Sequence, residues 1–334
     1  MIPLSILDLT PVRAGGTSSE ALANSIALAQ MAERRGFARV WYAEHHSMPG
    51  IASTAPDLLI AHVAAHTSRI RLGAGGVMLP NHAPLRIAEA YRLLEAMHPG
   101  RIDLGLGRAP GTDQRTALAL RGSREALVRD DFPEQLDELV AWAEGLPAGH
   151  PFRAVTAQPD DVPLPPIWLL GSSDYSAHLA AARGYPFAFA AHFSPAPPDP
   201  PMLAYRERFV PGVRPTPYAI LALSVFCADT TADAEALALP TLLAFVWLRT
   251  GRPARPPTLA EARAYQMTTL EQQVAAQVRA TQIIGTPDEV VARMAELAAR
   301  TRADEVMLTT HASDHAGRLG SFERVAEAWA RRAG

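Results

Sequence analysis

Polar side chains gather directly after the strand-like runs of this 334-residue chain. They are Glu44, His45 and His46; Asn81 and His82; Arg108; Ser172, Ser173 and Ser176; His192; and His311. An imidazole titrates near neutral pH and suits general acid–base work. A guanidinium and serine hydroxyls suit the oxygens of a phosphate group. The sequence therefore favours acid–base chemistry beside a bound phosphate, provided that the fold brings these positions together.

The segment Gly171-Ser172-Ser173-Asp174-Tyr175-Ser176 has the composition of a phosphate-binding loop. Glycine permits close backbone approach, and a helix that begins after the serines would present free N–H groups. The alternative is an ordinary serine helix cap. Arg108, expected on the same face, favours the phosphate interpretation over the cap.

His45 and His46 beside Glu44 could also be read as metal ligands. Adjacent residues of an extended segment point to opposite sides, so this triplet does not offer facing ligands. We expect no metal here, and one imidazole directed at the site. The alternative for each histidine is a ring satisfied by backbone groups at the rim.

Eight short β-type runs alternate with segments of helical periodicity, which is the pattern of a parallel sheet with crossover helices. The predicted strands are Leu4–Leu9, Arg39–Tyr42, Ile70–Ala74, Arg101–Leu106, Ile167–Leu170, Phe187–Ala190, Tyr218–Phe226 and Glu305–Leu308. This count predicts an α/β fold, a (β/α)8 TIM barrel with insertions. In such a barrel the residues after every strand share one face, where active sites lie.

The elements predict a single domain over residues 1–334. Ser18-Ser19-Glu20 begins a helix that closes at Gly36, and Thr286 caps another that starts at Pro287. A proline-rich segment at about 195–217 is expected to be an insertion over the barrel mouth, with one helix near Tyr205.

Composition excludes several function classes. The cations are all arginine, so lysine-dependent phosphate loops and Schiff-base chemistry are absent. Cys227 is the single cysteine, which excludes disulfide frameworks and cysteine–zinc sites within one chain. A net charge of −3 without basic runs speaks against nucleic-acid and membrane partners. No GxGxxG fingerprint occurs. A cytoplasmic location is expected, because no leader or long apolar stretch was found.

Three long motifs resemble the bacterial luciferase-like flavin monooxygenases. They are Trp41-Tyr42-Ala43-Glu44-His45-His46, the glycine-rich Gly73 to Pro84, and Gly100 to Arg108. The segments from Ile283 to Val290 and from Leu308 to His311 resemble the last barrel unit of that family. The resemblance implies a TIM barrel with reduced FMN, or in some branches the deazaflavin F420, at the carboxyl end of the strands.

The resemblance assigns roles to particular residues. His45 matches the family's active-site histidine, and Gly75-Gly76 matches a pair that forms a non-proline cis peptide against the flavin. Arg108, Ser173 and Ser176 match phosphate-binding positions, with Ser172 beside them. Val77, Met78 and Leu79 are expected to pack the ring, or else to be plain barrel core. Gly107 stands where bacterial luciferase has a reactive cysteine, so light emission is not implied.

The expected function is a monooxygenase that takes reduced FMN from a separate NAD(P)H:flavin reductase and oxygenates a small organic substrate with O2. An F420-dependent oxidoreductase, a non-catalytic flavin-binding protein and a metal-dependent hydrolase are the alternatives. The resemblance also implies a homodimer through barrel-side helices, for which the alanine-rich segments Ala21–Met31 and Ala55–Ala65 are candidates.

Overall fold

A computed structural model describes residues 2–312 and 314–332. Within them, eight parallel strands close into a barrel in the order β1-β2-β3-β5-β6-β7-β8-β10 and back to β1. Their bounds are β1 Leu4–Asp8, β2 Arg39–Tyr42, β3 Arg71–Ala74, β5 Ile102–Gly107, β6 Ile167–Gly171, β7 Phe187–Ala190, β8 Ala219–Cys227 and β10 Glu305–Thr309. The predicted (β/α)8 barrel and all eight predicted strands are confirmed.

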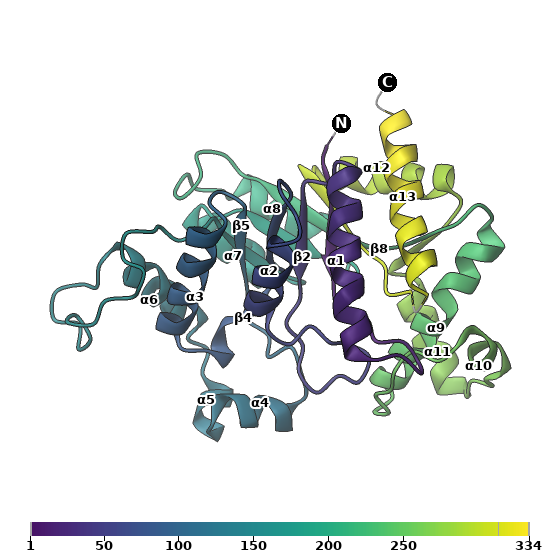
Figure 1. The fold of residues 1–334 in the computed structure, drawn as a ribbon, viewed down its shortest axis with the longest axis horizontal. Coiled ribbons are helices and arrows are strands. Elements are labelled where there is room, and N and C mark those ends of the chain that lie inside the picture. Colours follow the sequence, from purple (N-terminus) through teal and green to yellow (C-terminus); the bar gives the residue numbers. More distant parts are fainter. Residues whose placement is uncertain (1, 313, 333–334) are drawn as a thin grey trace.

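Helices surround the barrel (Figure 1). They are α1 Ser18–Arg34, α2 Pro56–Ala64, α3 Pro84–Met97, α4 Gln114–Arg121, α5 Arg124–Val128, α6 Phe132–Glu144, α7 Asp174–Arg183, α8 Asp199–Glu207, α9 Thr231–Arg249, α10 Leu259–Ala264, α11 Thr269–Arg279, α12 Pro287–Thr301 and α13 His315–Arg331, with a 3-10 turn η1 at Leu79–Asn81. Thr286 caps α12 as predicted, and α1 is capped by Thr17 in a capping box with Glu20.

Two short strands extend the barrel at its mouth. β4 (Val77–Met78) pairs with β5, and β9 (Gln282–Gly285) pairs with the end of β8. Between β8 and β9 the chain forms α9, α10 and α11, a helical insertion that the sequence analysis did not predict. α9 is long and apolar enough to cross a membrane by length and composition. α9 packs against the strands β8 and β9 and against the neighbouring helices α10 and α11. A single helix of this kind is weak evidence for a membrane span.

The proline-rich segment 195–217 does not cover the barrel mouth, and that expectation was wrong. Its helix α8, which includes Tyr205, is the crossover from β7 to β8 and packs on α7. The segment then returns along the amino-terminal end of the barrel, where Val210 N–H donates to the Ala181 carbonyl and Arg214 N–H to that of Gly184. Prolines fit here because little of this return is paired in a sheet.

Two of the hydrophobic clusters, one outside and one inside the strands, form the barrel. Apolar strand residues such as Ile6, Val40 and Leu104 pack outward against the helices. Inside the barrel, Trp41 and Trp168 meet edge to face, with ring centroids 5.3 Å apart, among Leu7, Ile220 and Met307. The alternation of strand side chains thereby fills the barrel and leaves its carboxyl end as the place for a site.

The floor of the barrel holds a buried ionic network. Arg39, the first residue of β2, donates to Asp103 at 2.8 Å and to Glu305 at 3.0 Å. Burial alone would lower the pKa of Arg39, but the charges of Asp103 and Glu305 outweigh it and raise that pKa. Trp41 Nε1 and Tyr218 Oη donate to the same two carboxylates. The network ties strands β2, β5 and β10 together.

Candidate functional site

Glu44 is the hub of the segment that leaves β2. Its side chain is 1% exposed, and its carboxylate lies 2.9 Å from Nε2 of both His46 and His82. The backbone N–H of Met78 also donates to it, at 3.0 Å. Burial alone would raise the pKa of Glu44, but the contacts with His82, His46 and Met78 outweigh it and lower the pKa. Glu44 thus fixes β4 against the end of β2, a role that sequence analysis missed.

His45 points to the other side of that segment. Its Nδ1 lies 3.0 Å from the Gly111 carbonyl, which can only accept, so Nδ1 carries the proton. Burial is the main cause that lowers the pKa of His45 below its usual 6.5. The neutral ring then presents Nε2 as a hydrogen-bond acceptor or base. The opposite directions of His45 and His46 confirm the expected alternation.

His192 follows β7 and His311 follows β10, so both lie at the same end of the barrel as His45, which follows β2. The charge of His45 contributes to lowering the pKa of both rings. Burial lowers the pKa of His192 to about 4 and that of His311 to about 3, so both rings are neutral at pH 7. Nδ1 of His192 is buried without a hydrogen-bond partner in the described part of the chain. Within residues 2–312 and 314–332, no group of histidines, cysteines and carboxylates has the geometry of a metal site.

The glycine pair after β3 lies close to neighbouring groups of the barrel. The Gly75-Gly76 peptide is cis, as expected from the resemblance. A Cβ atom on Gly75 would lie 2.7 Å from a methyl of Leu7, and one on Gly76 would lie 2.8 Å from the Gly105 carbonyl oxygen. Glycine is therefore required at both positions, and the peptide between them presents bare backbone.

Val77 and Leu79 do not line the mouth with their side chains. Both are buried in the core between the barrel and its helices, whereas Met78 is partly exposed and lies against Gly107. Strand alternation places Met78 opposite its two neighbours. The expected ring-packing role therefore suits Met78, and any contact of Val77 with a cofactor is left to its backbone.

Arg108 and the start of α7 meet, as the phosphate interpretation requires. The Arg108 guanidinium carbon lies 4.1 Å from the centroid of the Tyr175 ring, in the first turn of α7. Ser173 is the N-cap residue, yet its side chain makes no cap hydrogen bond, so first-turn N–H groups keep their capacity to donate. A Cβ atom on Gly171 would overlap the Ser176 side chain, which brings that hydroxyl close to the end of β6.

The carbonyl of Ser172 accepts a hydrogen bond from Ser194 Oγ at 3.2 Å, which links the segment after β6 to the segment after β7. Arg108 also forms an ion pair with Asp130 at 3.0 Å, with both side chains exposed. Such surface pairs contribute about 0–1 kcal/mol to stability. Arg108 can therefore leave Asp130 and pair with a phosphate group instead.

A cavity of about 770 Å³ is lined by Arg108 and by residues of α4 and α5. Its lining adds four further arginines to Arg108, namely Arg115, Arg121, Arg124 and Arg129. Sequence analysis passed over them because arginine is the chain's general cation, and only their gathering on two short helices after β5 would have indicated them. This positive cavity, the free α7 amides and the bare Gly75-Gly76 peptide fit a phosphate joined to a flat ring system.

The comparisons with known sequences cover nearly the whole chain. The sequence model of the luciferase-like monooxygenases matches residues 2–305. The chain is 45% identical to the Bacillus subtilis protein YvbT over 98% of this chain and 97% of that protein. It is 43% identical to a luciferase-like monooxygenase of Escherichia coli K12, with 96% and 95% covered. It is 34% identical to the N-acetyl-S-alkylcysteine monooxygenase of Bacillus subtilis, with 98% of each covered.

Solved structures share the fold. Apo-MsnO8 superposes with a TM-score of 0.88 at 34% identity over 99% of both chains. The FMN complex of the oxygenating constituent of 3,6-diketocamphane monooxygenase from Pseudomonas putida gives a TM-score of 0.73 at 21% identity, with 99% and 98% covered. An F420-dependent secondary alcohol dehydrogenase gives 0.69 at 15% identity, with 98% and 99% covered. The chain, with its closed barrel and the motifs at its mouth, belongs to the luciferase-like monooxygenase family.

Proposed function

We propose that this protein is a flavin-dependent monooxygenase that uses reduced FMN and O2 to oxygenate a small organic substrate. The observation that carries the proposal is the meeting of Arg108 with the uncapped start of α7, beside the bare Gly75-Gly76 peptide. In the reaction one oxygen atom enters the substrate and the other leaves as water. Reduced FMN, when bound, supplies the two electrons and the position at which O2 reacts.

Each residue at the mouth then has a distinct part. Arg108, Ser173, Ser176 and the α7 amides hold the phosphate, with Ser172 fixing the loop. The backbone from Gly75 to Val77 supports the flat ring, and Met78 shields it from water. His45 accepts or moves a proton at the reacting edge through Nε2. Glu44 keeps β4 and the His45 segment in register.

An NAD(P)H:flavin reductase is the proposed partner that supplies reduced FMN, because the sequence has no dinucleotide fingerprint. FMN is preferred over F420 because a relative at 34% identity is named a monooxygenase, whereas the F420-dependent neighbour shares 15% of its residues. An F420-dependent oxidoreductase is the second candidate, since that neighbour has the same barrel. The name of the 34% identical relative makes N-acetyl-S-alkylcysteines the first compounds to test as substrates.

Arg108→Ala tests the phosphate site. The variant is expected to bind FMN about 10- to 100-fold more weakly than wild type, because hydrogen bonds to charged groups contribute about 1.5–3 kcal/mol each. Riboflavin, which lacks the phosphate, is expected to bind both proteins equally. Fluorescence titration measures the two affinities.

Arg183→Ala, at the opposite end of α7, is the matched control and should leave both affinities unchanged. Equal weakening of FMN and riboflavin in Arg108→Ala would place Arg108 outside the phosphate site. Parallel titrations with F420 decide between the two cofactors, because an F420-dependent oxidoreductase should bind F420 more tightly than FMN.

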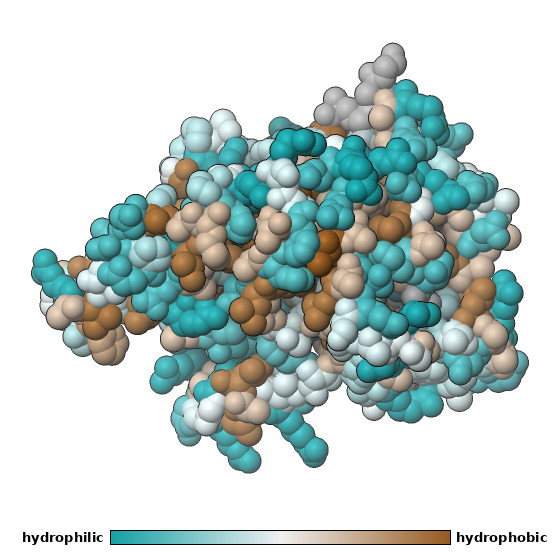
Figure 2. Space-filling view, in the orientation of Figure 1, coloured by the Kyte–Doolittle hydropathy of each residue, from teal (hydrophilic) through white to brown (hydrophobic). Residues whose placement is uncertain are grey.

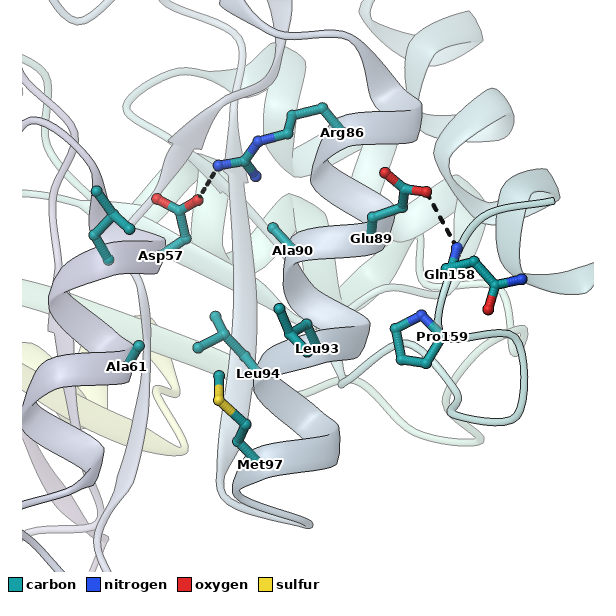
Figure 3. A pocket seen from close by; sticks show the side chains of 11 residues that line it. Asp57, Ala61, Arg86, Glu89, Ala90, Leu93, Leu94, Met97, Gln158 and Pro159 are labelled. Atoms are coloured by element: carbon teal, nitrogen blue, oxygen red, sulfur yellow. Dashed lines mark hydrogen bonds and ion pairs between the residues drawn. The ribbon is translucent and has the colours of Figure 1, made fainter. Parts of the chain in front are cut away.

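We also propose a homodimer that pairs through α2 and α3. A groove of about 620 Å³ runs between these helices, and Figure 3 shows Ala61, Leu94 and Met97 at the space between them. Leu58, Leu93 and Met97 are 70%, 53% and 49% exposed, and Figure 2 shows apolar side chains gathered over this face. Of the two alanine-rich candidates, the segment 55–65 lies at this groove.

Leu93→Glu is expected to shift the protein from about twice 35.9 kDa to the monomer mass in light scattering after gel filtration, because a charge cannot be buried there unpaired. Leu270→Glu, on the exposed face of α11, is the control and should leave the mass unchanged. A monomeric wild type, or a dimer that tolerates Leu93→Glu, would contradict pairing through this face.

A further inference from the structure

A second, smaller pocket opens at the mouth on the side away from Arg108. Its volume is about 70 Å³. It is bounded by the loop after β2, by α9 and by the end of β10, with Met48, Ile51, Ala244, Phe245, Leu248 and His311 among its lining residues. Arg108 and α7 follow β5 and β6, so the two sites occupy different sectors of the barrel mouth.

The pocket is built by specific contacts. Thr241 Oγ1 donates to the His311 carbonyl at 2.6 Å, which fixes α9 against the end of β10. The strap after α9 is fixed by Arg255, which donates to the carbonyls of Pro49 at 3.2 Å and Gly16 at 2.8 Å. Phe245 meets the His311 ring edge to face at 5.6 Å. These contacts fix α9, the end of β10 and the loop after β2 relative to one another. The side chains that make them have no part in the proposed phosphate site.

The lining of this pocket carries no charge at neutral pH. Its described residues include no carboxylate and no arginine, and His311 is neutral because burial lowers its pKa to about 3. A charged group that entered would lose its hydration without gaining a counter-charge. An apolar group would lose only unfavourable contact with water.

The pocket also adjoins the reacting part of the mouth. Met48 to Ile51, which line the pocket, belong to the loop that directly follows His45, and the His45 N–H donates to the Ser53 carbonyl of that loop at 3.0 Å. A molecule seated against Phe245 and Leu248 would therefore extend from α9 toward His45. Leu248, which is 37% exposed, lies at the outer end of the pocket.

We propose that this pocket, between α9 and the loop 48–51, holds a short uncharged alkyl group of the substrate and thereby selects substrates by chain length. The proposal rests on the proposed function, since it names the part of the substrate that the oxygenating site receives. Phe245 and Leu248 are its specificity-determining residues, and α9 belongs to the helical insertion between β8 and β9.

The test uses the full chain without FMN and linear alcohols from ethanol to 1-octanol as probes, titrated by saturation-transfer NMR. Affinity is expected to rise about fourfold per added methylene, as burial of about 0.8 kcal/mol each predicts, and to level off once the chain is longer than the pocket. The imidazole signal of His311 in histidine-labelled protein should shift on binding.

Leu248→Trp narrows the pocket and should abolish the rise with chain length, whereas Leu270→Trp, an exposed leucine of the same insertion, should not. Phe245→Ala should move the plateau to longer chains. Circular dichroism and thermal unfolding verify that the variants fold. A flat series in wild type, or an unchanged series in both Leu248→Trp and Phe245→Ala, would overturn the proposal.

These outcomes separate the pocket from the proposed function. Length-dependent alcohol binding in a protein that fails to bind reduced FMN would keep the pocket and remove the monooxygenase. Reduced FMN binding without length-dependent alcohol binding would remove the alkyl pocket and keep the proposed monooxygenase.

Discussion

Replacement of His45 by alanine is expected to lower substrate turnover by about 100- to 10,000-fold, the usual contribution of a positioned acid–base group. FMN affinity should stay within a few-fold of wild type, because His45 contacts neither Arg108 nor the start of α7 in the described structure. Turnover is measured on whichever test compound wild type oxygenates fastest, with reduced FMN supplied by a reductase.

His45→Asn separates chemistry from position. Asparagine can still donate to the Gly111 carbonyl in place of Nδ1, but it has no group at the place of Nε2. It should therefore lose turnover as His45→Ala does. Unchanged turnover in either variant would remove His45 from the reaction.

The pH profile gives a second readout of the same group. Because burial lowers the pKa of His45, the ring is neutral at pH 7 and becomes protonated only below pH 6.5. Turnover in wild type should thus fall as the pH drops below that value. The residual turnover of His45→Asn should lack this acidic limb, since the titrating ring is gone.

Arg39→Met is expected to lower the free energy of unfolding by about 3–5 kcal/mol, the usual result of removing one partner from a buried ion pair. The change leaves Glu305 without the guanidinium 3.0 Å away and Asp103 without one of its two arginines. Urea denaturation monitored by circular dichroism measures the loss.

Arg35→Met is the matched control. Arg35 pairs with Glu323 and Glu327 at the surface, where all three side chains are more than a third exposed. Exposed pairs contribute about 0–1 kcal/mol. A loss in Arg39→Met no larger than in Arg35→Met would show that the barrel floor does not depend on the network.

The barrel could be predicted from sequence because its strands are continuous apolar runs between helices with clear ends, such as the one that begins at Thr286. β4 could not, because two residues make no periodic pattern and its pairing with β5 depends on Glu44 holding Met78. The proline-rich segment 195–217 was wrongly expected to cover the barrel mouth, and the reason is physical. Proline excludes regular pairing but permits a helix that starts with prolines, as α8 does at Asp199.

For the site too, the sequence pattern predicted some features, whereas others depend on tertiary contacts. Strand ends predicted which residues share the mouth, and Arg108 does lie against Tyr175 in the first turn of α7. The direction of each side chain depended on local alternation, which placed Val77 in the core and Met78 at the mouth. The gathering of arginines on α4 and α5 around one cavity, and the pocket beside α9, depend on how insertions fold back, which no short-range pattern encodes.

The most direct test of the central claim is an anaerobic titration of the purified protein with reduced FMN, followed by admission of oxygen while the absorbance spectrum is recorded. We expect saturable binding near one FMN per chain and, after oxygen, an absorbing species that persists before the spectrum of oxidised FMN develops. Substrate should shorten its lifetime, which separates an oxygenase from a protein that merely holds flavin. Failure to bind reduced FMN would contradict the account and leave F420 as the cofactor to pursue.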